Sequence, residues 1–190
     1  MKIRFFFSYT FYCWILLSHF ALAFSEKNSS EIDTATINYL RTNFYVAVDN
    51  KKVTYELISF IEQMFDTNIE SYKPVILAYR GALEALQAKH TYNPFSKVSY
   101  LISSLRKIEH AVENKPDCLE IRFIRFSILH HLPGILGYNN ELREDAEAIV
   151  SLLSLKDYSN LNSEIQKGII EFMLESKRLT EIQESKIKKL

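Results

Sequence analysis

The sequence predicts an all-α fold, with antiparallel helical hairpins in one domain. Apolar residues recur at helical spacing through most of the chain. Prolines and short polar residues stand where helices would begin. No segment has the sustained alternation or the Asn-Gly turns that are typical of a sheet. About seven helices of roughly 13–20 residues, joined by short connections, would form such hairpins.

Residues 1–23 have the three parts of a secretory signal peptide. Lys2 and Arg4 form the basic start, a mostly apolar stretch follows, and residues 21–23 read Ala-Leu-Ala, a cleavage site of small residues. The rival reading is a membrane anchor, but the apolar core is short for a spanning helix and polar residues interrupt it. We therefore expect a cleaved Sec-type signal peptide. The mature protein, residues 24–190, would be periplasmic or extracellular and would have no membrane span.

Charge and cysteine content argue against several classes of protein. The chain has 23 Lys and Arg residues against 23 Asp and Glu residues, so nothing indicates binding to nucleic acid or to an anionic membrane. Cys118 is the only cysteine after the leader, which excludes an intramolecular disulfide in the mature chain. Stability must therefore come from a packed core, and a hydrophobic content of 47% can supply one.

In the first half of the mature chain, periodicity predicts helices over residues 31–48, 53–65 and 73–90. Within the first of these, residues 43–48 are also compatible with a strand. The third predicted helix opens with a proline and has a side made only of small residues, which would let a neighbouring helix approach closely. Asn93 is a plausible N-cap for the next helix, which runs to Glu113. Its predicted buried stripe consists of Val98, Leu101, Ile102, Leu105, Ile108, Ala111 and Val112.

In the second half, Asp117 and Glu120 have the spacing of a capping box, which predicts a helix from there to His131, before Pro133 and Gly134. Another helix is expected over residues 141–155. Ser163 and Gln166 form a second capping-box pattern, which predicts a helix toward Leu179. Beyond Thr180 the chain is mostly charged, and we expect it to fray.

A repeat pattern is visible but incomplete. Ser104, Ile108, Ala111 and Pro116 have the spacing of second-helix positions and the terminal proline in a tetratricopeptide repeat (TPR). The pattern fails after Pro116, where the arginine-rich stretch replaces the apolar residues and glycine of the next repeat. We interpret residues 24–190 as a degenerate, TPR-like bundle or short solenoid.

Two stretches carry a resemblance to known sequences. They are LAYRGALEALQAKHTYNPFSK, residues 77–97, and LEIRFIRFSILHHLPGILGY, residues 119–138. In these the chain resembles a group of small exported proteins, mostly uncharacterised, from Bacteroidetes-type bacteria. The resemblance implies an exported helical domain, and it brings no established activity with it.

Arg122 and Arg125 are the most unusual residues of the predicted core. They share one face of a helix whose other faces are mostly apolar, so we expect them to be partly buried and to need carboxylates or carbonyls. In the structural reading, which we favour, they form ion pairs with Glu84, Glu144 or Asp145. In the functional reading they bind an anion, because the guanidinium fork suits a carboxylate or phosphate.

The histidines are weaker candidates. His130 and His131 are adjacent, so on a helix they point about 100° apart and cannot chelate one metal as a close pair. His90 and Tyr92 lie in a polar turn that could form the rim of a groove, or could serve only in local capping. Cys118 lies in a first helical turn but lacks a Cys-His-Asn signature. We expect no metal site and no cofactor.

Three functions remain open. The first is a non-enzymatic module that binds a protein or peptide in a groove between helices. The second is a small-molecule, anion-binding or hydrolytic domain, with Arg122 and Arg125 and the histidines around a pocket. The third is a structural accessory without a ligand site.

Overall fold

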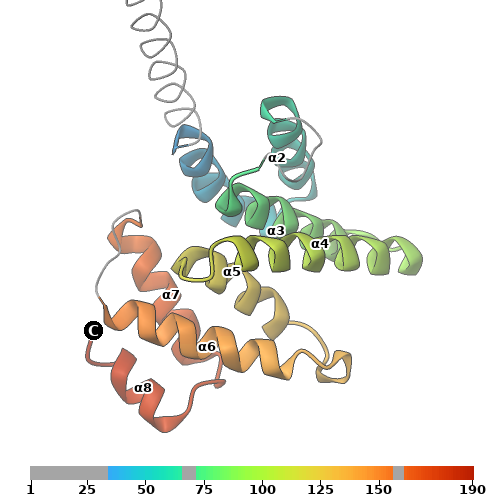
Figure 1. Cartoon of the computed structure of the whole chain (residues 1–190). Coiled ribbons are helices and arrows are strands. Elements are labelled where there is room, and N and C mark those ends of the chain that lie inside the picture. The colour runs from blue at the N-terminus through green and yellow to red at the C-terminus, as the bar shows by residue number, and fades with distance from the viewer. Residues whose placement is uncertain (1–33, 66–71, 156–160) are drawn as a thin grey trace, which may run out of the picture. The chain divides into compact units, whose positions relative to one another are not determined.

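The computed structural model describes residues 34–65, 72–155 and 161–190. Within these ranges every regular element is a helix, so the predicted all-α class is confirmed (Figure 1). The predicted signal peptide lies outside the described residues. Contacts divide the chain into two units, Met1–Thr42 and Asn43–Leu190. In the first unit residues 34–42 are helical, and the second unit contains residues 43–49, also helical, and all the helices that follow.

The N-terminal part of the second unit is formed by α2 (Lys51–Met64), α3 (Pro74–His90) and α4 (Pro94–Asn114). Of all the helix pairs, α3 and α4 have the most extensive contact. Gly81 makes this closeness possible, because a Cβ atom there would lie 2.6 Å from Cγ1 of Ile108 and 2.9 Å from the backbone oxygen of Ser104. The predicted close approach along the small-residue side of α3 is therefore confirmed.

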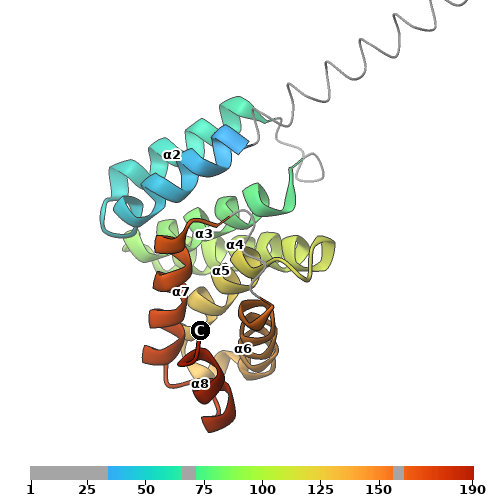
Figure 2. The same cartoon turned by 90° about the vertical axis from the view of Figure 1, so that its left-hand side faces the viewer.

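The C-terminal part consists of α5 (Leu119–His130), α6 (Asn139–Ser154), α7 (Ser163–Glu175) and α8 (Glu181–Ile187), with a short 3₁₀ helix, η2 (Gly134–Leu136), between α5 and α6. α5 contacts α3, α4 and α6, and α8 lies beside α6 (Figures 1 and 2). One apolar core joins these helices, and its fully buried members include Phe126, Ile149, Leu153, Ile169 and Met173.

Two predicted helix starts shift by one residue. The Asn93 side chain accepts hydrogen bonds from the backbone of Phe95 and Ser96, as predicted. The expectation for Asp117 was wrong, since Cys118 is the N-cap of α5 and no side chain caps that end. Ser163 is the first residue of α7, and Asn162 is its cap. In both cases the pattern locates the turn but not the residue at which the backbone becomes helical.

The segment beyond Thr180, where we expected fraying, forms α8. Thr180 and Gln183 make a reciprocal capping box at its start. Ile187 is only 1% exposed in the core shared with α6, whereas Ile182 is exposed. One buried side chain and two capping hydrogen bonds thus stabilise a helix that the charged composition of this segment does not predict.

The predicted buried stripe of α4 is only half correct. Ile108, Ala111 and Val112 are buried, but Val98 is 57% exposed and Ile102 53% exposed. The helices that follow, α5 and α6, pack only on the C-terminal half of α4. The core around α5 and α6 extends along α4 as far as Leu105. The N-terminal half of α4 therefore lacks the cover that periodicity alone predicts.

Candidate functional site

Arg125 of α5 and Asp145 of α6 form a two-pronged ion pair at the centre of the C-terminal helices. Nε of Arg125 donates to Oδ2 of Asp145 at 2.7 Å, and Nη2 donates to Oδ1 at 2.8 Å. The third guanidinium nitrogen, Nη1, donates to Oε2 of Glu109 on α4 at 2.7 Å. Arg125 is 3% exposed and Asp145 0%. One side chain therefore ties three helices together.

Arg122, one turn earlier on α5, completes the group. Its Nη1 donates to Oε1 of Glu144 at 2.6 Å and to Oδ1 of Asp145 at 3.0 Å. Its Nε donates to the carbonyl oxygen of Pro116 at 2.7 Å, which ties α5 to the turn before it. We call Arg122, Arg125, Glu109, Glu144 and Asp145 the arginine–carboxylate cluster.

The ionisation of the cluster follows from its burial. Burial opposes the charge of Arg125, but hydrogen bonds and attraction to Asp145 and Glu109 outweigh it and raise the pKa of the guanidinium. Burial raises the pKa of Asp145, and the two arginines only partly offset this. The hydrogen bond from Arg122 lowers the pKa of the more exposed Glu144. Asp145 is thus the member of the cluster whose negative charge depends most on its hydrogen-bonded partners.

Both arginines already hold carboxylates of the chain itself. An incoming anion would have to displace Glu109, Glu144 or Asp145, and this geometry favours the structural reading of the pair. Two of the three proposed partners are present. Glu84, the third, instead accepts hydrogen bonds from Arg80 at 2.8 Å and from Lys107 at 3.0 Å.

Sequence reasoning missed Glu109 as a partner of Arg125. The signal was present, because Glu109 lies four residues after Leu105 and so shares the α5-facing side of α4. Helical periodicity predicts burial for apolar residues, so it does not indicate that an acidic residue on that side of the helix is paired in the core.

The histidine pair lies at the C-terminal end of α5. The ring of His130 stacks on Phe126, with centroids 6.3 Å apart, and meets Phe172 of α7 edge-on at 5.6 Å. Nδ1 of His131 is 2.7 Å from the carbonyl oxygen of Ser127, so this nitrogen carries the proton. Burial, followed by the nearby charges of His131 and Arg178, lowers the pKa of His130. His130 therefore packs as a neutral aromatic ring.

The turn between α3 and α4 is separate from these groups. Nε2 of His90 is 3.2 Å from the carbonyl oxygen of Ala47. Tyr92 is fully exposed. Among the described residues, no hydrogen bond, ion pair or ring contact joins this turn to the arginine–carboxylate cluster or to the histidine pair. The structure thus distributes the predicted site residues over three places.

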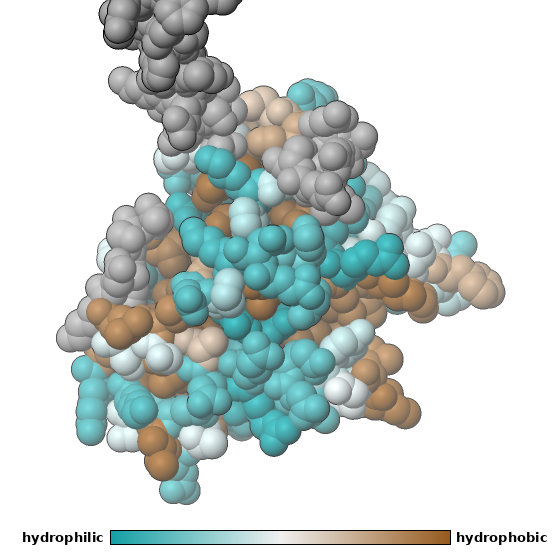
Figure 3. Space-filling model, viewed as in Figure 1, coloured by the Kyte–Doolittle hydropathy of each residue, from teal (hydrophilic) through white to brown (hydrophobic). Residues whose placement is uncertain are grey.

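The outer side of α4 carries a row of exposed apolar side chains. Phe95 is 85% exposed, and Val98 and Ile102 follow at spacings of three and four residues. Ser99, Ser103 and Arg106 lie along the same side, and the six residues line a shallow depression of about 420 Å³. We call these six residues the α4 face. Figure 3 shows hydrophobic surface along the part of α4 that extends away from α5.

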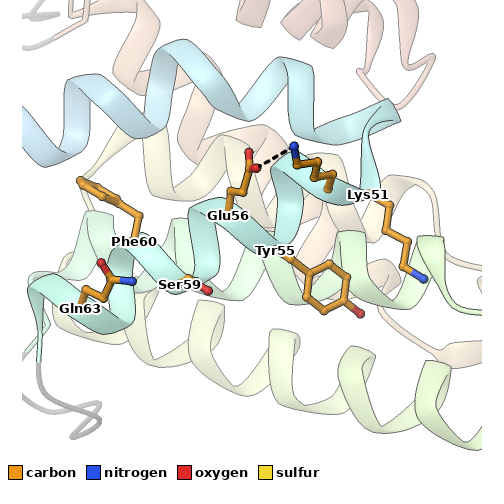
Figure 4. Close-up of a pocket in the computed structure, with 7 residues that line it drawn as sticks. Lys51, Tyr55, Glu56, Ser59, Phe60 and Gln63 are labelled. Carbon is orange, nitrogen blue, oxygen red and sulfur yellow. Dashed lines mark ion pairs between the residues drawn. The ribbon is translucent and has the colours of Figure 1, made fainter.

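A second depression, of about 800 Å³, lies on α2. All its lining residues come from that one helix, with Lys51 and Tyr55 at one end and Phe60 and Gln63 at the other (Figure 4). Lys52 and Glu56 form an exposed ion pair at 3.5 Å within it. Since neither depression has an opposing wall, both are open surfaces rather than the enclosed clefts that bind small molecules.

Metal and thiol chemistry have no geometric support in the described ranges. There, no group of three or more His, Cys, Asp and Glu side chains is placed to hold a metal ion. Cys118 is partly exposed at the start of α5 and has no disulfide partner among the described residues. No described helix is both long enough and apolar enough to span a bilayer.

Comparison with known proteins does not assign the chain to a family. No family model, no curated protein and no solved structure matches the chain.

Proposed function

We propose that this protein is an exported helical interaction module that binds a protein or peptide partner on the α4 face. One observation carries the proposal: Phe95, Val98 and Ile102 stay exposed in a row on a helix whose other half is buried in the core. A row at this spacing is what one helix presents to another across an interface.

The size of the apolar row suggests how strong such binding is. Full burial of a Phe, Val or Ile side chain contributes about 1.5–3 kcal/mol. Because Phe95 is 85% exposed, Val98 57% and Ile102 53%, burying their exposed parts would supply roughly 3–6 kcal/mol, against an association cost of about 4–15 kcal/mol. The apolar row alone supports a transient complex, so a stable one requires polar contacts as well.

The arrangement of the helices also suits this role. α3 packs along α4, and α5 then packs on both of them before α6 packs on α5. Such stepwise packing supports the proposal of a degenerate TPR-like array, in which each added helix covers the previous ones. Arrays of this type leave elongated faces open for partners. The α4 face would be one such surface.

Site-specific photocrosslinking in the producing cells tests the proposal. A photoreactive phenylalanine analogue replaces Val98 on the α4 face or, as a matched control, Lys167, whose side chain is 77% exposed on α7. We expect discrete adducts from position 98 that are absent from position 167. Adding Ile102→Ser should remove them without lowering the melting temperature. Identical adduct patterns from the two positions, or none from position 98, would contradict the proposal.

Export is tested separately. N-terminal sequencing of the protein from the cell envelope or medium should begin at Phe24, directly after the Ala-Leu-Ala site. Recovery of the intact chain beginning at Met1 would contradict a cleaved signal peptide.

A further inference from the structure

We infer that the partner of the α4 face is an acidic amphipathic helix, which places carboxylates along Ser99, Ser103 and Arg106 and its apolar side on Phe95, Val98 and Ile102. This rests on the proposed function and adds the chemistry of the partner. The argument comes from charge, hydrogen-bonding capacity and spacing.

Charge is the first step. From residue 85 to residue 108 the chain has no Asp or Glu, whereas Lys89, Lys97, Arg106 and Lys107 are all cationic. Lys89 pairs with Asp49 at 2.9 Å, and Lys107 pairs with Glu84. Arg106 is exposed and makes no ion pair with any residue that the structure describes. The nearest acid along the helix, Glu109, is held by Arg125 at 2.7 Å. Arg106 therefore stays available to the carboxylates of a partner.

The serines are the second step. Ser127, Ser154 and Ser176 donate to carbonyl oxygens of their own helices, the usual local bond for serine in a helix. No such bond is found for Ser99 or Ser103 within α4. The Oγ atom of Ser103 already accepts a hydrogen bond from Lys107 at 2.8 Å, so its own hydrogen is directed elsewhere. The polar side of the α4 face therefore offers donors.

Spacing is the third step. Phe95 and Ile102 are seven residues apart, which is about 10 Å along a helix at 1.5 Å per residue. Two turns of a partner helix have the same length and can offer apolar residues at matching intervals. Because the apolar and donor residues run side by side along α4, they match a helix with an apolar stripe beside an acidic one. A membrane surface does not present apolar and acidic groups in parallel rows.

Binding of designed peptides tests the inference. Two labelled peptides of about 18 residues would share one leucine stripe, flanked by Glu in one peptide and by Lys in the other. At 0.05 M salt we expect the Glu peptide to bind the purified protein about tenfold more tightly, which corresponds to about 1.4 kcal/mol. The preference should shrink at 0.5 M salt, where charges are screened. Arg106→Glu should cancel or reverse it, whereas Lys167→Glu on α7 should leave it unchanged.

Several results would overturn the inference. Equal affinity for the two peptides shows that acids are not selected. A preference that survives Arg106→Glu shows that the α4 face is not what selects them. Cosedimentation with anionic phosphatidylserine vesicles but not with the Glu peptide indicates a lipid surface instead. A dimer in sedimentation equilibrium that Ile102→Ser dissociates indicates a second copy of this chain. If neither peptide binds while position 98 still gives specific crosslinks, the acidic-helix inference fails and the proposed function stands; if those crosslinks are also absent, both fail.

Discussion

Asp145 accepts hydrogen bonds from both Arg122 and Arg125 while its own side chain has no exposure to solvent. A fully buried carboxylate between two helices thus pairs with two guanidinium groups at once, while Glu144 and Glu109 supply the remaining negative charge. Removing one partner of a buried pair is costly, because the remaining charges stay buried without compensation.

Asp145→Asn should therefore destabilise the protein by about 3–5 kcal/mol, since it keeps the shape of the side chain and removes its charge. Urea unfolding followed by circular dichroism measures the change. Glu144→Gln is the matched control, and because Glu144 is 58% exposed its loss should cost less than about 1 kcal/mol. Similar costs for the two variants would mean that the cluster is not the buried network described above.

Gly81→Ala should lower stability by about 1–3 kcal/mol, because the new methyl group would overlap Ile108 and the backbone of Ser104. Gly168→Ala on α7 provides the contrast. There the nearest atom is 4.0 Å away, so alanine should stabilise the helix by about 0.5–1 kcal/mol. Thermal melting compares both with the parent. A neutral Gly81→Ala would show that α3 and α4 can separate without cost.

His130 should make stability depend on pH. Its pKa in the folded protein lies below the ordinary value of 6.5, so the unfolded chain takes up a proton first as the pH falls. The stabilisation that the neutral His130 ring contributes is fully present above pH 6.5 and is lost as the pH falls below it. The melting temperature should fall more between pH 7.5 and 5.5 in the parent than in His130→Phe, which keeps an aromatic ring against Phe126 and Phe172.

Between pH 8.5 and 7.5 the two proteins should behave alike, because the imidazole is neutral in both states there. Parallel curves through the acidic window as well would show that His130 is equally easy to protonate in the folded and unfolded states.

Ile187 should anchor α8. Ile187→Ala is expected to cost about 2–5 kcal/mol, as for other buried isoleucines, and to increase hydrogen exchange in residues 181–187. Ile182→Ala, at a position 71% exposed in the same helix, should change stability by less than about 0.5 kcal/mol. If the two variants are equivalent, α8 is not held by its contact with α6.

Helix positions could be predicted from the sequence because they depend on local signals. Asn93 followed by Pro94 identifies the start of α4 within one turn of chain. At Asp117 a similar signal was off by one residue, since a capping pattern does not specify which backbone turns helical first.

The partners of charged residues could not be predicted in the same way. Glu84 and Glu109 both lie close in sequence to residues of the core. Only the packing of the helices determines that Glu84 pairs with Arg80 and Lys107. The same packing brings Glu109 to Arg125. The exposure of Ile102 has the same origin. Its periodicity is that of a buried residue, and it is exposed because α5 and α6 pack only on the other half of α4. The choice of ion-pair partner and the exposure of Ile102 both depend on tertiary contacts, which the sequence pattern of a single helix does not reveal.

The partial covering of α4 has a consequence for how this protein can evolve. At 1.5 Å per residue, α4 is about 31 Å long and α5 about 18 Å long. The covered half of α4 is constrained by Gly81 and the core, and substitutions there carry a folding penalty. On the other half, the exposed side chains of Phe95, Val98 and Ile102 can change with little effect on folding. Mutations can thus change partner binding while the fold stays intact, because the residues needed for folding and those available for binding lie on different halves of the same helix.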